Sequence, residues 1–551
     1  MTDDAPHPGP AARRLYRGGA VYSPADPFAT AMLVEGSTIA WVGPEEAAGA
    51  WTREDDEVVD LHGALVAPAF VDAHVHLTAT GLGAGGLDLS RARSARDVLD
   101  LVASRAGTGL VTGSGWDEST FTDPTLPTAA ELERAAGGPV HLSRTDGHSA
   151  LVSTSFAALA GLPPGQGLVT EQEHHRALHA RWAALEAPAA EAARRAALRS
   201  AAAHGIGTVH EMSGDALAPL GDLAALTALA GVGTDAERHA GREALPDVVG
   251  YLATAVRTPE QAREVLAAAA GAGMALAGLG GDLTLDGALG SRTAALNSDY
   301  ADAPGVRGQL HLDAVAVRDH LHACTLAGVP AAFHAIGDAA LDLLAAAAEA
   351  VAADLGAAVV ASAGHRVEHA VLPGPDVVAT FGRLGLGVST QPGFEAAWGG
   401  PGGLYERRLG PDRAAGTHPL ARLAAAGVPL ALGSDTPVTP FDPWGAVRAA
   451  GFSRHPEHAV SVRAAFLAHT RGGHRLARRG HPGTLTPGAP ATYAVWSTDA
   501  LVVQAPDRRL SGWSTDARSG TPGLPDLAPG AEAPTCTRTV VDGVVVFDAT
   551  A

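Results

Sequence analysis

The stretch PAFVDAHVHL, residues 68–77, joins an apolar run to two histidines that are one residue apart. Side chains at positions i and i+2 of a strand lie on the same face, so His74 and His76 can present imidazole nitrogens to one point. Imidazole is a good zinc ligand, and two of them at the end of a buried strand would supply half of a catalytic site. In a chain with 24 histidines, a solvated strand end could carry the same pattern by chance. Other residues must therefore show whether His74 and His76 bind a metal.

Length and composition favour a large α/β enzyme. A (β/α)₈ barrel with attachments fits 551 residues, and 46% hydrophobic residues suffice for a large core. The net charge of −20 argues against a nucleic-acid partner or an anionic membrane surface. No apolar stretch has the length of a membrane span; residues 265–281 come nearest. Cys324 and Cys536 stand far apart, which argues against a disulfide framework and favours a reducing, cytoplasmic location.

The middle of the chain alternates between two kinds of segment. Ala-rich helical stretches such as residues 343–353 separate short β-like runs, a pattern typical of parallel β/α architecture. Short strands with tight turns occupy both ends and predict one shared sandwich. We therefore expect an α/β fold, with a (β/α)₈ TIM-type barrel in residues 67–480 and an insertion at about 85–205 near the barrel mouth. Residues 1–66 and 481–551 would form a small composite β-sandwich domain.

Polar residues follow most of the β-like runs, and barrel closure would bring them to one mouth. A metal ion that activates water needs three or four nitrogen or oxygen ligands and a carboxylate to take the proton. Each residue alone could be an ordinary core or surface residue, but five in one β/α frame point to a metal site. The candidates are His74, His76, His334, His369 and Asp435.

The order of these motifs resembles that of the amidohydrolase superfamily, in particular the family 3 branch that includes N-substituted formamide deformylase. The resemblance covers nearly the whole chain. It implies a metal-dependent (β/α)₈ hydrolase of a small molecule with a non-peptide C–N bond, and it implies metal-site roles for the five candidates. The motifs are HVH at 74–76, HAIGD at 334–338, RVEH at 366–369 and GSD at 433–435, with support from GWDES at 115–119, RTDGHS at 144–149, DGALGSRTA at 286–294 and GTLTPG at 483–488.

One position departs from the family pattern. Many members carry a lysine on strand 4, four residues before the Asp-Gly that corresponds to Asp286-Gly287, and its carbamate bridges two metals. Here that position is Asp282, and the chain contains no lysine, so we expect no carbamylated lysine. Aspartate is several bonds shorter than a carbamylated lysine, so we expect Asp282 to be too short to reach both metals. Glu211, at the end of a predicted strand, is the better substitute bridge.

These arguments favour one ion over two, and zinc is the expected metal. His74, His76, His334 and Asp435 would hold it, and His369 would be free to hydrogen-bond the developing oxyanion. The alternative is a binuclear site with Glu211 as the bridge. Zinc is preferred only by analogy with other metal-dependent hydrolases, because nitrogen and oxygen ligand sets accept several divalent metals.

Three functions remain open at this point. The first is hydrolysis of an amide or N-formyl substrate, with Asp435 as general base. The second is deamination of a cyclic amidine at a mononuclear site, and the third is a catalytically silent, ligand-binding barrel. The family-like loops place Trp116, Asp146, His148 and Arg292 near the substrate, although Arg292 could equally be a structural ion-pair partner. Oligomeric state is left open, a homo-oligomer included.

Overall fold

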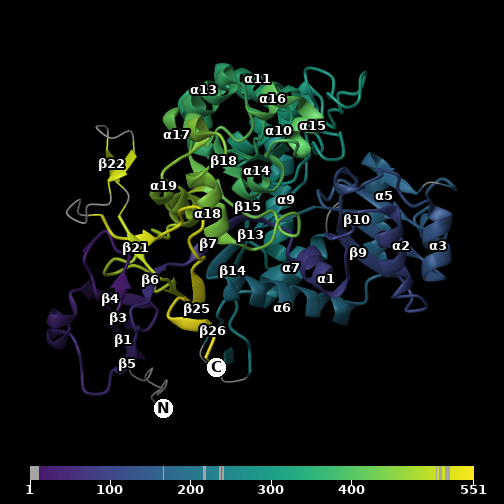
Figure 1. Cartoon of the computed structure of the whole chain (residues 1–551). Helices are drawn as coiled ribbons and strands as arrows, with labels where there is room; N and C mark the ends of the chain where they lie inside the picture. Colours follow the sequence, from purple (N-terminus) through teal and green to yellow (C-terminus); the bar gives the residue numbers. More distant parts are fainter. Residues whose placement is uncertain are drawn as a thin grey trace, which may run out of the picture.

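The chain forms a mixed α/β fold (Figure 1). The structure is a computed structural model that describes residues 12–165, 167–214, 219–234, 237–238, 241–503, 505–507, 512–514 and 521–550. Two parallel sheets lie in the middle of the molecule, a separate lobe holds a third sheet, and strands from both ends of the chain build further sheets.

The two central sheets each contain four parallel strands. Single parallel bridges join them at both edges, between Leu279 and Ala331 and between Val75 and Thr436. The carboxyl ends of these strands carry most of the predicted site residues. The first sheet consists of β7 (Phe70–Val75), β13 (Ile206–Ser213), β14 (Asp247–Leu252) and β15 (Leu276–Leu279), and the second of β16 (Ala332–Ala335), β17 (Arg366–His369), β18 (Gly387–Thr390) and β19 (Leu430–Leu432).

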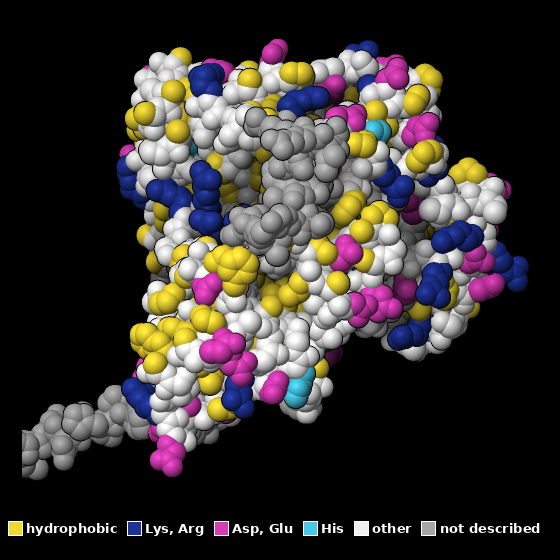
Figure 2. All heavy atoms as spheres, turned by 60° about the vertical axis from the view of Figure 1, so that its left-hand side comes forward, with side chains coloured by type: hydrophobic (Ala, Val, Ile, Leu, Met, Phe, Trp, Pro, Cys, Tyr) yellow, Lys and Arg dark blue, Asp and Glu magenta, His cyan; other side chains and the backbone are white. Residues whose placement is uncertain are grey.

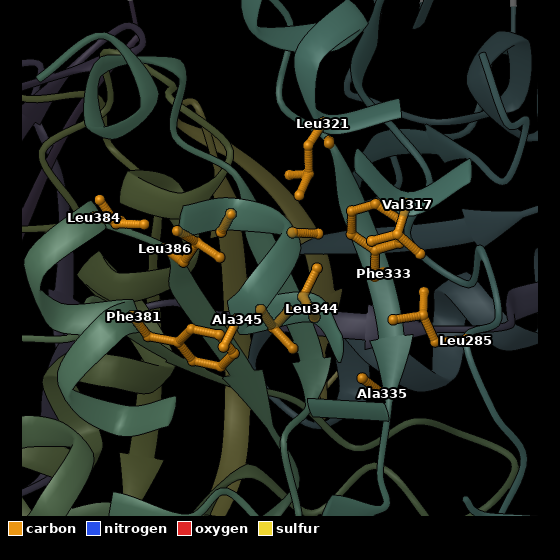
Figure 3. Packing of buried hydrophobic residues seen from close by; sticks show 14 of the residues in the cluster. Leu285, Val317, Leu321, Phe333, Ala335, Leu344, Ala345, Phe381, Leu384 and Leu386 are labelled. Carbon is orange, nitrogen blue, oxygen red and sulfur yellow. The ribbon is translucent and has the colours of Figure 1, made fainter. Parts of the chain in front are cut away.

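Helices connect these strands and cover them with apolar side chains. Phe333 of β16 packs in one buried cluster with Val317, Leu344 and Phe381, which come from three different helices (Figure 3). Burying such side chains outside the sheet leaves its strand ends free for polar residues. The helices of this region are α1 (Leu77–Gly85), α6 (Ala187–Ala203), α7 (Leu220–Leu229), α9 (Pro259–Gly271), α10 (Ala314–Ala327), α11 (Asp338–Leu355), α12 (Ala357–Ala363), α13 (Pro375–Leu384), α14 (Pro392–Trp398), α15 (Leu404–Leu409), α16 (Pro411–Ala414), α17 (Leu420–Ala425), α18 (Pro443–Gly451), α19 (Val462–Leu467) and α20 (Gly473–Leu476).

Residues 87–183 form the lobe at the right of Figure 1. Its sheet has the order β12-β11-β10-β9-β8. The helix α5 follows the last of these strands and, as shown below, lines a cavity with one face. The lobe consists of β8 (Leu87–Asp88), α2 (Ala95–Ala103), β9 (Val111–Trp116), α3 (Ala129–Ala136), β10 (Val140–Arg144), β11 (Ser149–Val152), α4 (Thr154–Leu159), β12 (Leu168–Thr170) and α5 (Glu171–Ala183).

Strands from the two ends of the chain share one five-stranded sheet, in the order β2-β6-β20-β25-β26. A second terminal sheet has the order β4-β3-β1-β5, and the Tyr493 hydroxyl donates to that of Tyr16 at 2.8 Å between the two. Asp542 and Gly543 form the turn between β25 and β26, both with positive φ. These strands are β1 (Arg13–Arg17), β2 (Ala20–Val21), β3 (Ala31–Glu35), β4 (Thr38–Gly43), β5 (Glu57–Asp60), β6 (Leu65–Pro68), β20 (Tyr493–Ser497), β25 (Thr535–Val541) and β26 (Val544–Asp548).

Cys324 and Cys536 are both buried and unpaired, which confirms the prediction that they form no disulfide. Within the described residues no single helix has the length and apolar composition of a membrane span. Only α11 and α12 taken together do, and a bend of 118° separates them. On the face drawn in Figure 2, acidic and arginine side chains are both spread among apolar ones.

Candidate metal centre

Asp282 and two of the predicted histidines form one side of a buried cluster. His74 and His76 project from the end of β7, and Asp282 lies in the loop after β15. The Nε2 atom of His76 is 3.0 Å from Asp282 Oδ2, and that of His74 is 3.5 Å from Asp282 Oδ1. Asp435, in the loop after β19, places Oδ1 3.4 Å from His74 Nε2 and 3.3 Å from His76 Nε2.

The other two predicted histidines approach the same Asp282 oxygen as His74 does. His334 Nδ1 is 3.5 Å from Asp282 Oδ1, and His369 Nε2 is 3.9 Å from it. The structure thus brings all five predicted residues together around Asp282. Three overlapping sets each have ligand atoms within 4.8 Å of one another: His74, His76 and Asp282; His74, His369 and Asp435; and Asp282, His334 and His369.

The expectation that Asp282 would be too short to serve both sides is therefore wrong. The backbone, rather than the side chain, supplies the missing reach. Gly280 and Gly281 have φ values of 119° and 80°, and a Cβ atom on Gly280 would lie only 1.7 Å from the Ala332 carbonyl oxygen. Two glycines in these conformations let the loop press against β16, so that a short carboxylate reaches the centre.

Each of the four histidines has one ring nitrogen fixed by an oxygen acceptor outside the cluster. His74 Nδ1 donates to the Glu368 carboxylate at 3.0 Å, and His76 Nδ1 donates to the Met212 carbonyl at 3.2 Å. His334 Nε2 donates to the Gly287 carbonyl at 3.3 Å, and His369 Nδ1 donates to Gln391 Oε1 at 2.9 Å. Because these acceptors require a hydrogen on the outer nitrogen, the inner nitrogen of each neutral ring presents a lone pair.

The inner atoms lack ordinary hydrogen-bond partners. Among the described residues, His74 Nε2, Asp282 Oδ1 and Asp435 Oδ1 are buried without a partner that satisfies hydrogen-bond geometry. The inner nitrogens of His334 and His369 are only 3.0 Å apart. A divalent cation would satisfy all of these lone pairs at once, so the donor set fits a metal ion.

The two carboxylates shift the protonation of the histidines. Burial lowers the pKa of His74, but the charges of Asp282 and Asp435 outweigh it and raise that pKa to about 10. The pKa of His76 is likewise raised well above its usual value against the effect of burial. A cation that binds here must therefore displace protons, which couples metal binding to pH.

Two of the clustered residues have a strained backbone. His369 and Asp435 have φ values of 70° and 56°, a region that residues with a Cβ rarely occupy. Such conformations persist only where the surrounding structure enforces them, and they cluster at functional sites.

Glu211, the predicted alternative bridge, is part of the cavity wall. Its Oε2 accepts a hydrogen bond from the Leu77 backbone N–H at 2.8 Å, and burial raises the pKa of its carboxyl to about 7. It belongs to none of the three close sets found among the described residues. The neighbouring His210 points the other way and contacts Arg366 at 3.2 Å, as the alternation of a strand predicts.

A cavity of about 550 Å³ opens beside this cluster. Its wall includes His76, Asp282, His334, His369 and Asp435 on one side, and residues of the lobe on the other. The lobe therefore covers the strand ends and contributes to the same space.

The four residues predicted to contact substrate divide evenly. His148 and Asp146 line the cavity, and the ring centre of His148 is 5.0 Å from that of His334. Trp116 does not line it: its side chain is buried in the core of the lobe, and its indole N–H donates to the Leu142 carbonyl at 2.9 Å. Arg292 pairs with Asp302 at 2.8 Å, which is the structural alternative.

Asp282, Glu368 and Gln391 are the site residues to which the sequence argument gave too little weight. The signal for Glu368 was present, because it precedes His369 in the RVEH motif. Its Oε2 also accepts from Arg366 Nη2 at 2.8 Å, so a buried cation holds the carboxylate that orients His74.

The sequence profile of the amidohydrolase family matches residues 57–547. The chain belongs to the amidohydrolase family. It is 26% identical over 511 residues to protein LONG AFTER FAR-RED 3 of Arabidopsis thaliana, covering 86% of this chain and 85% of the relative. It is 26% identical over 462 residues to the putative amidohydrolase YtcJ of Bacillus subtilis, covering 78% and 82%. A shorter match, 29% over 141 residues, covers 24% of this chain and 26% of N-substituted formamide deformylase from Arthrobacter pascens.

The structure is similar to that of an uncharacterized metal-dependent hydrolase from Pyrococcus horikoshii, with a TM-score of 0.69 and 25% identity over 89% of this chain and 98% of the other. This amidohydrolase is accordingly an enzyme that acts on C–N bonds other than peptide bonds in small molecules, and a divalent metal supports its activity. The resemblance inferred from the sequence is confirmed, and the catalytically silent alternative is not supported.

Proposed function

We propose that this amidohydrolase cleaves an amide or N-formyl bond with a water molecule activated between the two histidine pairs. One observation carries the proposal. The Asp282 carboxylate lies 3.0 to 3.9 Å from the ring nitrogens of four histidines, which are His74, His76, His334 and His369. It occupies the position at which the family resemblance implies a carbamylated lysine in many members. An aspartate held forward by two glycines replaces the longer group.

Two adjoining cation positions share Asp282 in this proposal. His74, His76 and Asp435 would hold the first together with one oxygen of Asp282, and His334 and His369 would complete the second. The prediction of a single ion remains untested, but the shared carboxylate favours two positions. Histidine nitrogen and carboxylate donors suit zinc, which we propose as the metal. A bound divalent ion supplies Lewis acidity, which favours ionised water and polarises the scissile carbonyl.

Asp435 is the proposed general base. Burial raises its pKa, but the neighbouring His74 and His76 more than offset this and hold the pKa below its usual value, so the carboxylate is ionised at neutral pH. It can accept the proton of the attacking water and return it to the leaving nitrogen, as general acid–base catalysis requires.

We assign His369 to the metal and give His148 the oxyanion-binding role that the sequence suggested for His369. The inner nitrogen of His369 is directed toward Asp282 Oδ1, which favours a ligand over an oxyanion donor. Burial and the nearby His334 lower the pKa of His148 to about 3, so its imidazole is neutral. A neutral imidazole in the cavity wall beside the centre can donate its N–H to the substrate carbonyl oxygen as negative charge develops there.

We also propose the finer architecture. The two parallel sheets, bridged at both edges, would close into a (β/α)₈ barrel over residues 67–480, with the lobe as an insertion within about 85–205. The pairing of β6 with β20 supports a composite β-sandwich domain of residues 1–66 and 481–551. The free thiols of Cys324 and Cys536 support a cytoplasmic location.

A substrate screen with metal-replete enzyme tests the activity. The panel should contain N-formyl amines, N-acyl amino acids and cyclic amidines, with formate, carboxylate, amine and ammonia measured separately. Release of formate or carboxylate with an amine is expected. Ammonia release from cyclic amidines alone would instead establish the deaminase function. Elemental analysis of the same preparation gives the metal identity and the number of ions per chain.

A further inference from the structure

The far end of the cavity contains a cationic side chain that has no acidic partner. Arg181 lies on α5 and lines the cavity together with His174, Leu178 and Trp182. These positions recur at helical spacing, so one face of α5 forms this part of the wall. Seven residues of helix separate His174 from Arg181, which is a rise of about 10 Å.

Arg181 differs from the other arginine in this wall. Arg144 lines the cavity too, but Asp117, Glu118 and Asp146 surround its guanidinium at 2.7 to 2.8 Å. Across the described part of the chain no carboxylate lies within ion-pairing distance of Arg181, and its buried Nε atom has no hydrogen-bond partner. Burial without compensation lowers the pKa of Arg181 to about 10, which still leaves it charged at neutral pH.

Two further buried histidines also have ring nitrogens without hydrogen-bond partners in the described structure. His141 is fully buried, and neither of its ring nitrogens has a partner among the described residues. His174 donates from Nε2 to the Gly147 carbonyl at 2.7 Å, but its Nδ1 is likewise unpartnered in the described structure. The charge of Arg181 contributes to lowering the pKa of both imidazoles, after the larger effect of burial.

We infer that this end of the cavity binds a carboxylate of the substrate, with the Arg181 guanidinium as its partner. The inference rests on the proposed function, which places the C–N bond at the other end. Leu178, Leu82 and Ala79 also line the cavity and favour an apolar spacer. The substrate class is therefore an N-formyl or N-acyl amine whose apolar chain ends in a carboxylate. Arginine suits this role because its planar guanidinium can donate two parallel hydrogen bonds to one carboxylate.

Matched substrates test the inference on the metal-replete enzyme. N-formyl-ω-amino acids, from the butanoic to the decanoic acid, are compared with N-formyl alkylamines of the same carbon number, and formate release is measured. We expect the acids to have the higher kcat/KM. Arg181→Met should lower kcat/KM for the acids roughly 10- to 100-fold, mainly through KM, because the lost contact is remote from the reacting atoms. The neutral amines should change less than about twofold, and Arg181→Lys should restore part of the difference.

The control is Arg176→Met, which removes an exposed arginine from another part of α5 that does not line the cavity. It should leave both substrate series unchanged. Equal kcat/KM for acids and amines in the wild type, or an equal loss of both in Arg181→Met, would overturn the inference while leaving the hydrolase function intact.

A binding measurement separates the inference from the proposed function. If no N-formyl or N-acyl compound is turned over, the proposed reaction fails, and calorimetric titration with octanoate still reads the carboxylate site. Octanoate should bind the wild type and Arg176→Met with the same affinity and bind Arg181→Met at least tenfold more weakly. Equal binding to all three would place the carboxylate elsewhere, for example on the metal, and would refute the assignment to Arg181.

Discussion

The two ends of the cavity carry opposite sets of polar groups. At the strand ends, Asp282, Asp435 and the inner nitrogens of four histidines converge, a donor set that suits a divalent cation. At the α5 end, the guanidinium of Arg181 has no carboxylate within ion-pairing distance in the described structure, which suits an anion.

This difference shows how one cavity can fix both the chemistry and the orientation of its substrate. Buried groups without partners reduce stability, so they persist where a ligand supplies what is missing. A cation at the first end supports catalysis, whereas a carboxylate at the second end holds a remote part of the substrate. Binding energy gained at a distance can then position the scissile bond.

The strongest way to break the catalytic end is to change the residue that both histidine pairs share. Asp282→Asn removes a negative charge within 3.5 Å of His74, His76 and His334. We expect loss of bound metal and a fall in kcat of about 10³-fold or more, because a neutral amide is a weak ligand between two positions. Elemental analysis and turnover on the same preparation measure both effects.

Glu211→Gln is the matched control and tests the rival bridge. Its carboxylate accepts from the Leu77 N–H, which a glutamine oxygen can also do, so metal content should stay within about twofold of the wild type. If Glu211→Gln loses as much metal as Asp282→Asn, the bridging carboxylate has been assigned to the wrong residue.

Asp435→Asn should separate catalysis from metal binding. Asparagine keeps the size and a coordinating oxygen but cannot accept the water proton. We expect metal content to be retained and kcat to fall by roughly 10²- to 10⁴-fold, the range for loss of a general base. Near-normal turnover in a metal-replete Asp435→Asn protein would refute the role of Asp435 as base.

Changing the carboxylate that orients His74 should have a smaller effect on metal binding. Glu368→Gln keeps an acceptor for His74 Nδ1 but removes the charge that polarises the imidazole and pairs with Arg366. We expect metal affinity to fall by roughly 10- to 100-fold, as for other residues that orient ligands. Competition with a chelator measures it. Glu395→Gln, a buried glutamate that accepts from the Arg454 N–H, should leave the affinity unchanged.

Much of the catalytic end was predictable because its residues belong to short motifs at strand ends. The His74-x-His76 pair needs only the alternation of a strand, and the motifs around His334, His369 and Asp435 follow apolar runs in the same way. Asp282 was misjudged because its reach depends on the backbone path through Gly280 and Gly281. Two glycines directly before an acid were the available signal.

The α5 end could not be predicted from local pattern. The spacing of His174, Leu178 and Arg181 identifies a helix face, but nothing in that spacing says which cavity the face will line. Trp116 was misplaced because the register of β9 shifts just before it, at Gly115 with φ 94°, and its side chain packs in the core of the lobe. How a lobe docks over strand ends is a property of tertiary packing.

The smallest predicted effect compares the two cavity arginines by stability instead of activity. Arg144 is buried among three carboxylates, and Arg144→Met should lower the free energy of unfolding by about 3 to 5 kcal/mol because it leaves buried negative charge unpaired. Arg181 has no such partner, so Arg181→Met removes an uncompensated charge and should raise that free energy by about 1 kcal/mol. Urea unfolding of both variants without substrate decides the sign. A loss for Arg181→Met as large as that for Arg144→Met would show that the protein itself satisfies Arg181, and the electrostatic contrast between the two ends would disappear. A gain would mean that stability is sacrificed at this position, as expected where a charge is kept for a ligand.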